Sequence, residues 1–490
     1  MSRIASDESD SAARAAKALT PSNERLSPRV QVHFGMGFIA NNLMIISLEH
    51  MLFPVYSLYI GLSPAVIGLA FALPRLWDAF MDVMVGIYSD NLRTRWGRRR
   101  PLIVAGAVSS GIAFALIWMV PNNLSDTGST VWLLGTLILF WTANTFYFIP
   151  LDALGMSLTE NYDERTSVMA YRIFFAKSVQ LASGWSFWLM ETGWLGAGRI
   201  GAISVGWLWG SLVIFFGVWP GVFLRENTYA EARTQPRSRF WQTVRLTFRS
   251  RSFVRITAYL LLASTSLSIS NAIHFYTHLH YVAQSDAQLA SKIYGVAISL
   301  NIIFGMLALP FVGWCSRRIG KHRTAQIAVS ATGFGALSSW FLMTPSSPWL
   351  SLGIAPFIGV GIVAVYQLYF AMLADAAEEA ALLHGKRSEG MYSAVSNCMV
   401  KAGQAAALAF AGVLLGWIGI EGKDMVPDED QILWLRSLRA SLPVVLSIGA
   451  VLCLNRYPLT RERLEEMRMA ARIAEGKKIP AARSHDEAPC

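Results

Sequence analysis

Two carboxylates lie four residues apart inside one of the most apolar stretches of the chain. They are Asp78 and Asp82 in "RLWDAFMD", which lies between the apolar runs "AVIGLAFALP" and "VMVGIY". Residues four apart share one face of a helix, so both acids point to the same side. An ionised acid at the centre of a bilayer costs about 2.5–3.5 kcal/mol on insertion scales. Such a pair is tolerated only if a bound cation, a proton or a basic side chain neutralises it.

A basic side chain that suits this pair lies far along the chain, in "CMVKAGQAAALAF". Lys401 is itself costly in an apolar span unless it is paired, and the small residues after it permit close helix packing. We therefore expect Lys401 opposite Asp78 or Asp82. A cation that displaces the ammonium from the carboxylates would then alter the contact between the two halves of the chain. A salt bridge that only locks helices together, or a lysine that snorkels to the membrane surface, are the structural alternatives.

Further polar residues within apolar spans are candidates for substrate contacts. Glu49, next to His50, is a third acid, and a shielded carboxyl beside a histidine suits protonation. Arg172 offers a rigid fork of donors to a hydroxyl or a carboxylate. Asp152 and Lys177 suit a structural or a functional role equally. The predicted substrate-binding set is Arg172, Asn42, Glu49, Asp152 and Tyr366.

The elements that must position these groups are apolar helices. Of the 490 residues, 53% are hydrophobic and only 15% are charged. Soluble globular chains carry about a quarter charged residues, so this deficit indicates a polytopic membrane protein. Apolar runs of about 20–30 residues recur as two sets of six. They lie near 33–59, 64–89, 102–120, 131–155, 167–190 and 201–223, and then near 253–283, 292–315, 324–343, 348–375, 391–420 and 432–455.

The net charge of +10 comes from basic residues in the loops between the apolar runs, so it does not indicate a nucleic-acid partner. Basic residues cluster in every second loop, at 93–100, 225–255, 317–323 and after 456, whereas the alternate loops are nearly uncharged or acidic. The positive-inside rule therefore predicts cytoplasmic termini and a cytoplasmic central loop. We expect no cleavable signal peptide in the polar first thirty residues. The four cysteines show no metal spacing and no obvious pairing, and we expect no cofactor.

An internal repeat divides the chain into two bundles. The segments "GIYSDNLRTRWGRRRP" (86–101) and "GWCSRRIGKHRT" (313–324) both read Gly-x-x-Ser, a polar pair, and then Gly followed by three basic residues. Corresponding loops of this kind are expected when two bundles are related by an axis along the membrane normal. The predicted organisation is a polar tail at 1–30, a bundle at 31–223, a central loop at 224–252, a bundle at 253–457 and a tail at 458–490.

The first copy of this repeat resembles the signature loop of the major facilitator superfamily. In that family the acidic residue and the arginines hold neighbouring helix ends together in one access state. The resemblance therefore implies a gating role for Asp90, Arg98 and Arg99. It also implies an all-α fold of twelve transmembrane helices in two six-helix bundles. The second copy has Arg317 where the first has Asp90, so only the N-terminal copy is complete.

Motifs along nearly the whole chain resemble a narrower group, the glycoside–pentoside–hexuronide:cation symporter family. They are "RLWDAFMD", "ERTSVMAYRIFFA" and "SEGMYSAVSNCMVKAGQA", in that order, within residues 33–465. The resemblance implies a cation site at Asp78, Asp82 and Thr145, a coupling role for Lys401, and a sugar contact for Arg172.

The chain also departs from that family. Met81 stands where the family's typical member has an asparagine of the sodium site, and the acids of its sugar site fall on Asn42 and Phe148. Because sodium is a hard cation that needs several oxygen ligands, the loss of one favours the proton slightly. The changed acids predict a different sugar.

The sequence therefore predicts a monomeric multi-pass symporter of the plasma (inner) membrane. It would couple uptake of a sugar or glycoside to a monovalent cation by alternating access. One alternative is a cation-coupled transporter of an amphiphile such as a lysolipid. An alternative of another class is a membrane receptor or assembly factor that transports nothing. The sequence contains no metal motif, nucleophile elbow or phosphate-binding loop, so we expect no enzyme.

Overall fold

Helices make up every regular element that the structure describes. This computed structural model describes residues 26–156, 158, 162–224, 248–384, 389–420, 427–459 and 461–474. The helices of the first half are α2 (Pro28–Phe53) continued by η1 (Pro54–Ile60), α3 (Pro64–Asn91), α4 (Arg100–Trp118), α5 (Asp126–Met156), α6 (Tyr162–Ser183), α7 (Ser186–Glu191) and α8 (Gly198–Phe223).

The second half repeats this arrangement. Its helices are α10 (Arg251–Tyr276) continued by η3 (Thr277–Val282), α11 (Ala287–Ile319), α12 (Lys321–Leu342), η4 (Pro348–Ile354) leading into α13 (Ala355–His384), α14 (Glu389–Ile418) and α15 (Glu429–Leu454), followed by α16 (Arg461–Ala474). Each of the predicted apolar runs falls on one of these helices or on a helix with its short extension, except the run at 167–190, which is divided between α6 and α7. The expected all-α fold is confirmed.

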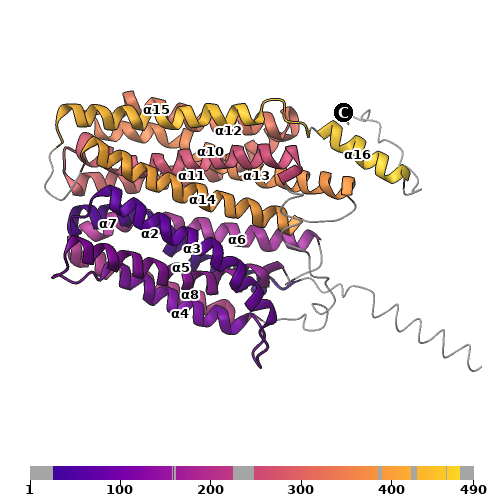
Figure 1. Cartoon of the computed structure of the whole chain (residues 1–490), viewed down its shortest axis with the longest axis horizontal. Helices are drawn as coiled ribbons and strands as arrows, with labels where there is room; N and C mark the ends of the chain where they lie inside the picture. The colour runs from indigo at the N-terminus through magenta and orange to yellow at the C-terminus, as the bar shows by residue number, and fades with distance from the viewer. Residues whose placement is uncertain are drawn as a thin grey trace, which may run out of the picture.

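The long helices run side by side along one direction, with the two halves of the chain in separate layers (Figure 1). Nine of the described helices, counted with their short extensions, are long and apolar enough to cross a membrane. Helices α3, α6 and α12 are not among the nine, but they run alongside them (Figure 1). The count of twelve spans stays a prediction.

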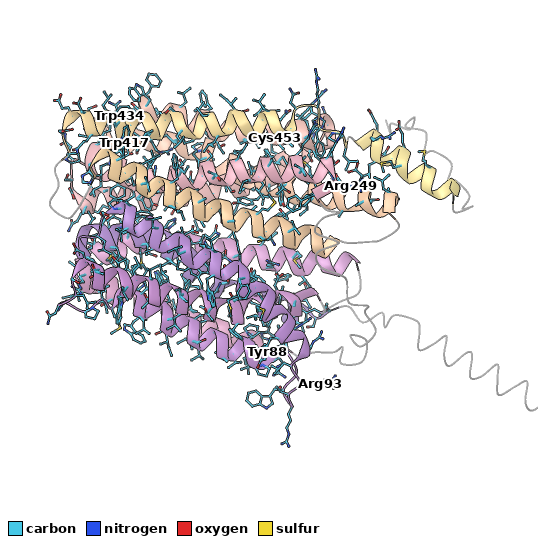
Figure 2. All side chains as sticks on the ribbon, viewed as in Figure 1. Tyr88, Arg93, Arg249, Trp417, Trp434 and Cys453 are labelled. Carbon is cyan, nitrogen blue, oxygen red and sulfur yellow. The ribbon has the colours of Figure 1, made fainter. Side chains whose placement is uncertain are left out.

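The basic loops gather at one end of the bundle. Figure 2 shows Arg93 and Arg249 at this end and Trp417 and Trp434 at the opposite end. The positive-inside rule places an end with basic loops in the cytoplasm, and this placement remains a prediction. Most of the predicted central loop and most of both predicted tails lie outside the described residues. Helix α16, inside the predicted C-terminal tail, packs its buried Leu464 against the core of the second half.

The two halves meet most closely where α3 crosses α14. An added Cβ at Gly68 would lie 2.7 Å from the carbonyl oxygen of Leu408, and one at Gly412 would lie 2.5 Å from that of Pro64. Both distances are too short for a real side chain, so these glycines allow the two backbones to touch. The charged residues of α3 are thereby held against α14.

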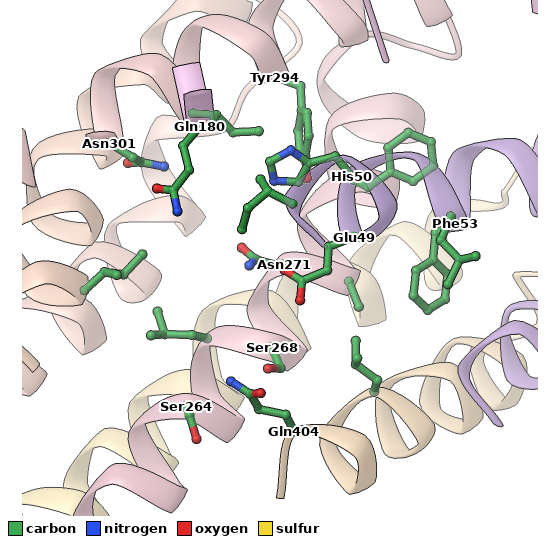
Figure 3. Close-up of a pocket in the computed structure, with 18 of the residues that line it drawn as sticks. Glu49, His50, Phe53, Gln180, Ser264, Ser268, Asn271, Tyr294, Asn301 and Gln404 are labelled. Atoms are coloured by element: carbon green, nitrogen blue, oxygen red, sulfur yellow. The ribbon is translucent and has the colours of Figure 1, made fainter. Parts of the chain in front are cut away.

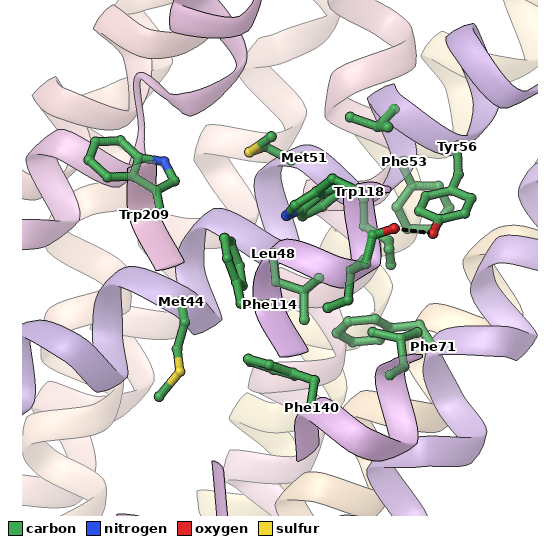
Figure 4. Close-up of a cluster of buried hydrophobic side chains, with 14 of the residues drawn as sticks. Met44, Leu48, Met51, Phe53, Tyr56, Phe71, Phe114, Trp118, Phe140 and Trp209 are labelled. Carbon is green, nitrogen blue, oxygen red and sulfur yellow. Dashed lines mark hydrogen bonds between the residues drawn. The ribbon is translucent and has the colours of Figure 1, made fainter. Parts of the chain in front are cut away.

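Aromatic residues join the halves at the end away from the basic loops. Phe53 packs edge-on against Tyr276 with ring centroids 6.3 Å apart, and Phe187 packs against Phe275 at 5.5 Å. Behind this contact lies the buried aromatic cluster of the first half (Figure 4), in which the Tyr56 hydroxyl donates to the carbonyl oxygen of Ile117 at 2.5 Å. The two ring contacts of Phe53 and Phe187 hold the halves together at this end.

Candidate functional site

A charged cluster lies between α3 of the first half and α14 of the second. The ammonium of Lys401 donates to Asp78 Oδ2 at 2.8 Å and to Asp82 Oδ2 at 2.5 Å. The Asp78 side chain is 2% exposed, and those of Lys401 and Asp82 are 24% and 25% exposed. The expected pairing of Lys401 with these acids is therefore present, and it involves both of them. One ammonium balances only one of the two carboxylates when both are ionised, so the cluster carries one excess negative charge.

A third helix holds this cluster in place. Thr145 on α5 donates its hydroxyl to Asp78 Oδ1 at 2.8 Å. One turn earlier on α5, Thr142 accepts a bond of 2.9 Å from the Trp77 indole. The oxygens that would face a cation in place of the ammonium belong to Asp78, Asp82 and Thr145. Within the described residues, no group of three or more His, Cys, Asp or Glu is placed to hold a metal ion.

A second ion pair lies one turn away on α3. Arg75 binds Glu49 on α2 at 3.2 Å, and its guanidinium lies 3.8 Å from the centre of the Trp141 ring. Arg75 is nearly buried, at 7% exposure, so both contacts offset the cost of a charge in an apolar span. The sequence analysis missed Arg75. The signal was available, since Arg75 is a charge three residues before Asp78 in the same apolar span and needs a partner for the same reason.

A cavity of about 310 Å³ lies between the two halves beside these charges. Arg75 and Gln404 line it, and each is three residues from a member of the charged cluster, Asp78 on α3 and Lys401 on α14. The amides of Gln180 and Asn301 and the polar groups around Glu49 are drawn in Figure 3. Its polar lining comprises Glu49, His50, Arg75, Lys177, Gln180, Ser264, Ser268, Asn271, Tyr294, Asn301, Tyr366 and Gln404.

The structure brings only part of the predicted substrate-binding set to this cavity. Glu49 and Tyr366 line it. Asn42 does not line the cavity, but its side-chain oxygen accepts a hydrogen bond of 3.3 Å from Gln180, which does. Arg172 and Asp152 are not part of the lining and bind each other at 2.6 Å. Each of these two neutralises the other, which accounts for two charges in adjacent apolar helices without a substrate.

Of the predicted gating residues, the structure describes the arginines. Arg99 donates to the carbonyl oxygen of Ala153 on α5 at 2.7 Å, and the next residue, Arg100, donates to that of Gly221 on α8 at 2.8 Å. The basic loop is therefore tied to the ends of two helices. Arg98 belongs to the same loop, whereas the side chain of Asp90 lies outside what the structure describes.

Both copies of the repeated loop use their glycine in the same way. Gly97 has a φ of 102° and Gly320 a φ of 89°, in the region that favours glycine. After Gly320, Lys321 binds Asp375 on α13 at 2.6 Å. Each copy thus turns at a glycine and then fastens a basic side chain to a neighbouring helix.

Comparison with known proteins shows to which family the chain belongs. The chain matches the family described as MFS/sugar transport protein over residues 33–461. It is 26% identical to the isoprimeverose transporter of Lactiplantibacillus pentosus, with 81% of each chain covered. It is 23% identical to the inner membrane symporter YicJ of Escherichia coli (strain K12), which covers 93% of this chain and 97% of that one.

Solved structures show the same fold. A structure of proton-dependent oligopeptide transporters superposes with a TM-score of 0.64 at 13% sequence identity, covering 88% of this chain and all of the other (100%). The expected absence of enzyme activity also agrees with a family of transport proteins. With a family match over nearly its whole length, the chain belongs to the MFS/sugar transport protein family.

Proposed function

We propose that this protein carries a sugar or glycoside across the plasma (inner) membrane together with a monovalent cation, by alternating access. The observation that supports this most strongly is the contact of Lys401 with both Asp78 and Asp82, across the two halves and beside a polar cavity. A cation that binds the carboxylates competes with the ammonium for the same oxygens. Cation binding therefore weakens a bond between the two halves.

Coupling follows from the position of the cavity. Substrate hydroxyls would bind the amides and hydroxyls of the lining, which come from both halves. The cation acts on α3 and α14, which also contribute Arg75 and Gln404 to that lining. Because both ligands act on the same two helices, occupancy of one site alters the geometry of the other. The halves then rock around the loaded site.

We favour the proton over sodium as the coupled cation. A proton needs one carboxylate oxygen, whereas sodium needs several oxygen ligands. Asp78, Asp82 and Thr145 supply few of them, and the thioether of Met81 is a poor ligand for a hard cation. The roles of these residues in coupling are part of the proposal.

The test is flux through the purified full-length protein in lipid vesicles. Sugar uptake, proton flux and sodium flux are measured for the native chain and for Asp78→Asn and Asp82→Asn. We expect both variants to lose cation-driven accumulation. Undiminished coupled uptake in both variants would refute the proposal. Cation-driven uptake of lysophosphatidylcholine, with no uptake of any sugar, would favour the amphiphile alternative.

A further inference from the structure

A second cavity, of about 210 Å³, lies at the end of the bundle away from the basic loops. The short helix α7, which Figure 1 shows at this end, and the turn after it form one wall, and the first turns of α11 form the other. The walls belong to different halves of the chain, so this outer cavity spans the seam between the halves. Its lining includes Trp188, Glu191 and Trp194 on one wall and Gln288, Ser291 and Lys292 on the other.

A contact between the halves lies between the outer cavity and the central cavity of about 310 Å³. The indole of Trp185, in the turn between α6 and α7, donates to Ser299 Oγ on α11 at 2.9 Å. The same ring lies over Gly295, where an added Cβ would come within 2.9 Å of it. Along α6–α7 and along α11, Gln180 and Asn301 of the central cavity lie on one side of this contact and the outer cavity lies on the other. The outer cavity is therefore beyond the point where the two halves close over the central cavity.

Indole rings give the outer cavity an apolar surface. Trp188 packs edge-on against Trp185 with ring centroids 5.4 Å apart, and against Trp194 with centroids 5.9 Å apart. The side chain of Trp194 is 79% exposed. Three indoles thus extend from the contact between the halves to the outside. The C–H face of a pyranose ring packs well against such flat aromatic faces, since both then lose apolar area to water.

Polar groups of both signs accompany these indoles. Glu191 accepts a hydrogen bond from the Tyr59 hydroxyl, and Lys292 lines the opposite wall. Among the residues that the structure describes, no carboxylate lies within 4.0 Å of the Lys292 ammonium, so Glu191 does not neutralise it directly. The carboxylate disfavours an anionic ligand, and the ammonium disfavours a cationic one, including the quaternary ammonium ions that bind indoles. A neutral ligand whose hydroxyls donate to Glu191 and accept from Lys292 satisfies both groups.

We propose that the outer cavity binds a neutral pyranose ring as a second sugar site, and that a sugar bound there holds this end of the protein closed. This inference rests on the proposed sugar transport. The ligand contacts both halves, so it binds only while they are together at this end. A ligand shifts a conformational equilibrium toward the state that it binds. Because uptake requires the halves to separate here, sugar at high external concentration slows its own uptake.

Inhibition of uptake by excess sugar tests the inference, with the full-length protein in vesicles and its basic loops facing the inside. The probes are the methyl pyranosides of glucose, galactose and xylose, and calorimetry measures the binding of each to the purified protein. For a sugar that is carried, the native chain should show two classes of site. Its initial uptake rate should pass through a maximum and then fall, about twofold when the external concentration equals the dissociation constant of the outer site.

Substitutions on both walls identify the site. Trp194→Ala should weaken the outer site about tenfold and move the fall in rate to about tenfold higher concentration, whereas Trp194→Tyr should keep it. Lys292→Met, on the opposite wall, should also move the fall to higher concentration. Both side chains are exposed, so neither change disturbs the packed core. The control is Trp434→Ala, which removes an exposed indole at the same end but outside both cavities and should behave as the native chain.

The outcomes distinguish this inference from the proposed function. A native uptake rate that rises only to a plateau, or a fall in rate that Trp194→Ala leaves unchanged, overturns the outer site and leaves symport standing. Failure of all three glycosides to move with a proton or sodium gradient overturns the proposed function, and this inference with it.

Discussion

Replacing Lys401 by methionine removes the one ammonium that two carboxylates share, and its consequences follow from the geometry. At an effective dielectric constant of about 20, unit charges 2.8 Å apart attract each other by about 6 kcal/mol. Most of this gain offsets the cost of burying the charges. Removal of one partner from a buried pair nevertheless costs about 3–5 kcal/mol, because the remaining charge is uncompensated. Asp78, at 2% side-chain exposure, has little access to water that would relieve it.

The loss of stability in Lys401→Met should depend on which cation is supplied. In Lys401→Met the carboxylates Asp78 and Asp82 repel each other until one binds a proton or a cation. Thermal unfolding of the purified variant should begin several degrees below that of the native chain near neutral pH without sodium. Its stability should recover as pH falls if the site takes protons, or as sodium is added if it takes sodium. The same titration therefore identifies the coupled cation.

Transport by Lys401→Met should also change, because its cation site no longer has a competing ammonium. Without the ammonium to compete, Lys401→Met keeps its cation bound, so exchange of substrate continues while accumulation driven by a cation gradient stops. The control is Arg463→Met, which breaks the exposed Arg463–Glu466 pair of 3.0 Å on α16, where such pairs contribute about 1 kcal/mol or less. Full accumulation by Lys401→Met, or stability that ignores both pH and sodium, would show that the contact is only structural.

Three further substitutions test other contacts. Thr145→Val removes the hydroxyl donated to Asp78; in uptake assays it should weaken sodium affinity about tenfold if sodium is coupled, and should tighten proton binding if the proton is coupled, because the lost hydrogen bond stabilised the ionised carboxylate, whereas Thr145→Ser should leave both unchanged. Gly412→Val places methyl groups where even a Cβ would lie 2.5 Å from a backbone oxygen of α3, so its midpoint of thermal unfolding should fall, unlike that of Gly135→Val, where the site is open. Arg99→Ala frees the basic loop from α5 and should slow the transport cycle severalfold in exchange assays, with little change in substrate affinity.

The charged cluster was predictable from the sequence because burial of charge leaves few solutions. Two acids on one helix face and one lysine in another apolar span each need a partner, and they satisfy each other. The same argument extends to Arg172 and Asp152, which the sequence analysis assigned to the substrate. In the structure they pair on adjacent helices, since two opposite charges need no ligand when they can reach each other.

The cavity was harder to predict, because its polar lining comes from seven helices of both halves. Asn271, Asn301 and Gln404 are single polar residues in apolar spans. Periodicity alone does not say whether such an amide faces a cavity, a neighbouring helix or the lipid. That depends on how far each helix is rotated, and packing across the two halves sets this rotation.

Helix α3 links the two parts of the site. Arg75, Asp78 and Asp82 follow each other at spacings of three and four residues, so one face of one helix carries a contact to Glu49 in the cavity and two contacts to Lys401. In the proposed mechanism, a cation that releases Lys401 changes the force on this helix, and a substrate that contacts Glu49 or Arg75 acts on the same helix one turn away. The glycines that bring α3 against α14 make this transfer possible, because a looser interface would absorb the movement. The proposed coupling therefore needs no path through the rest of the protein.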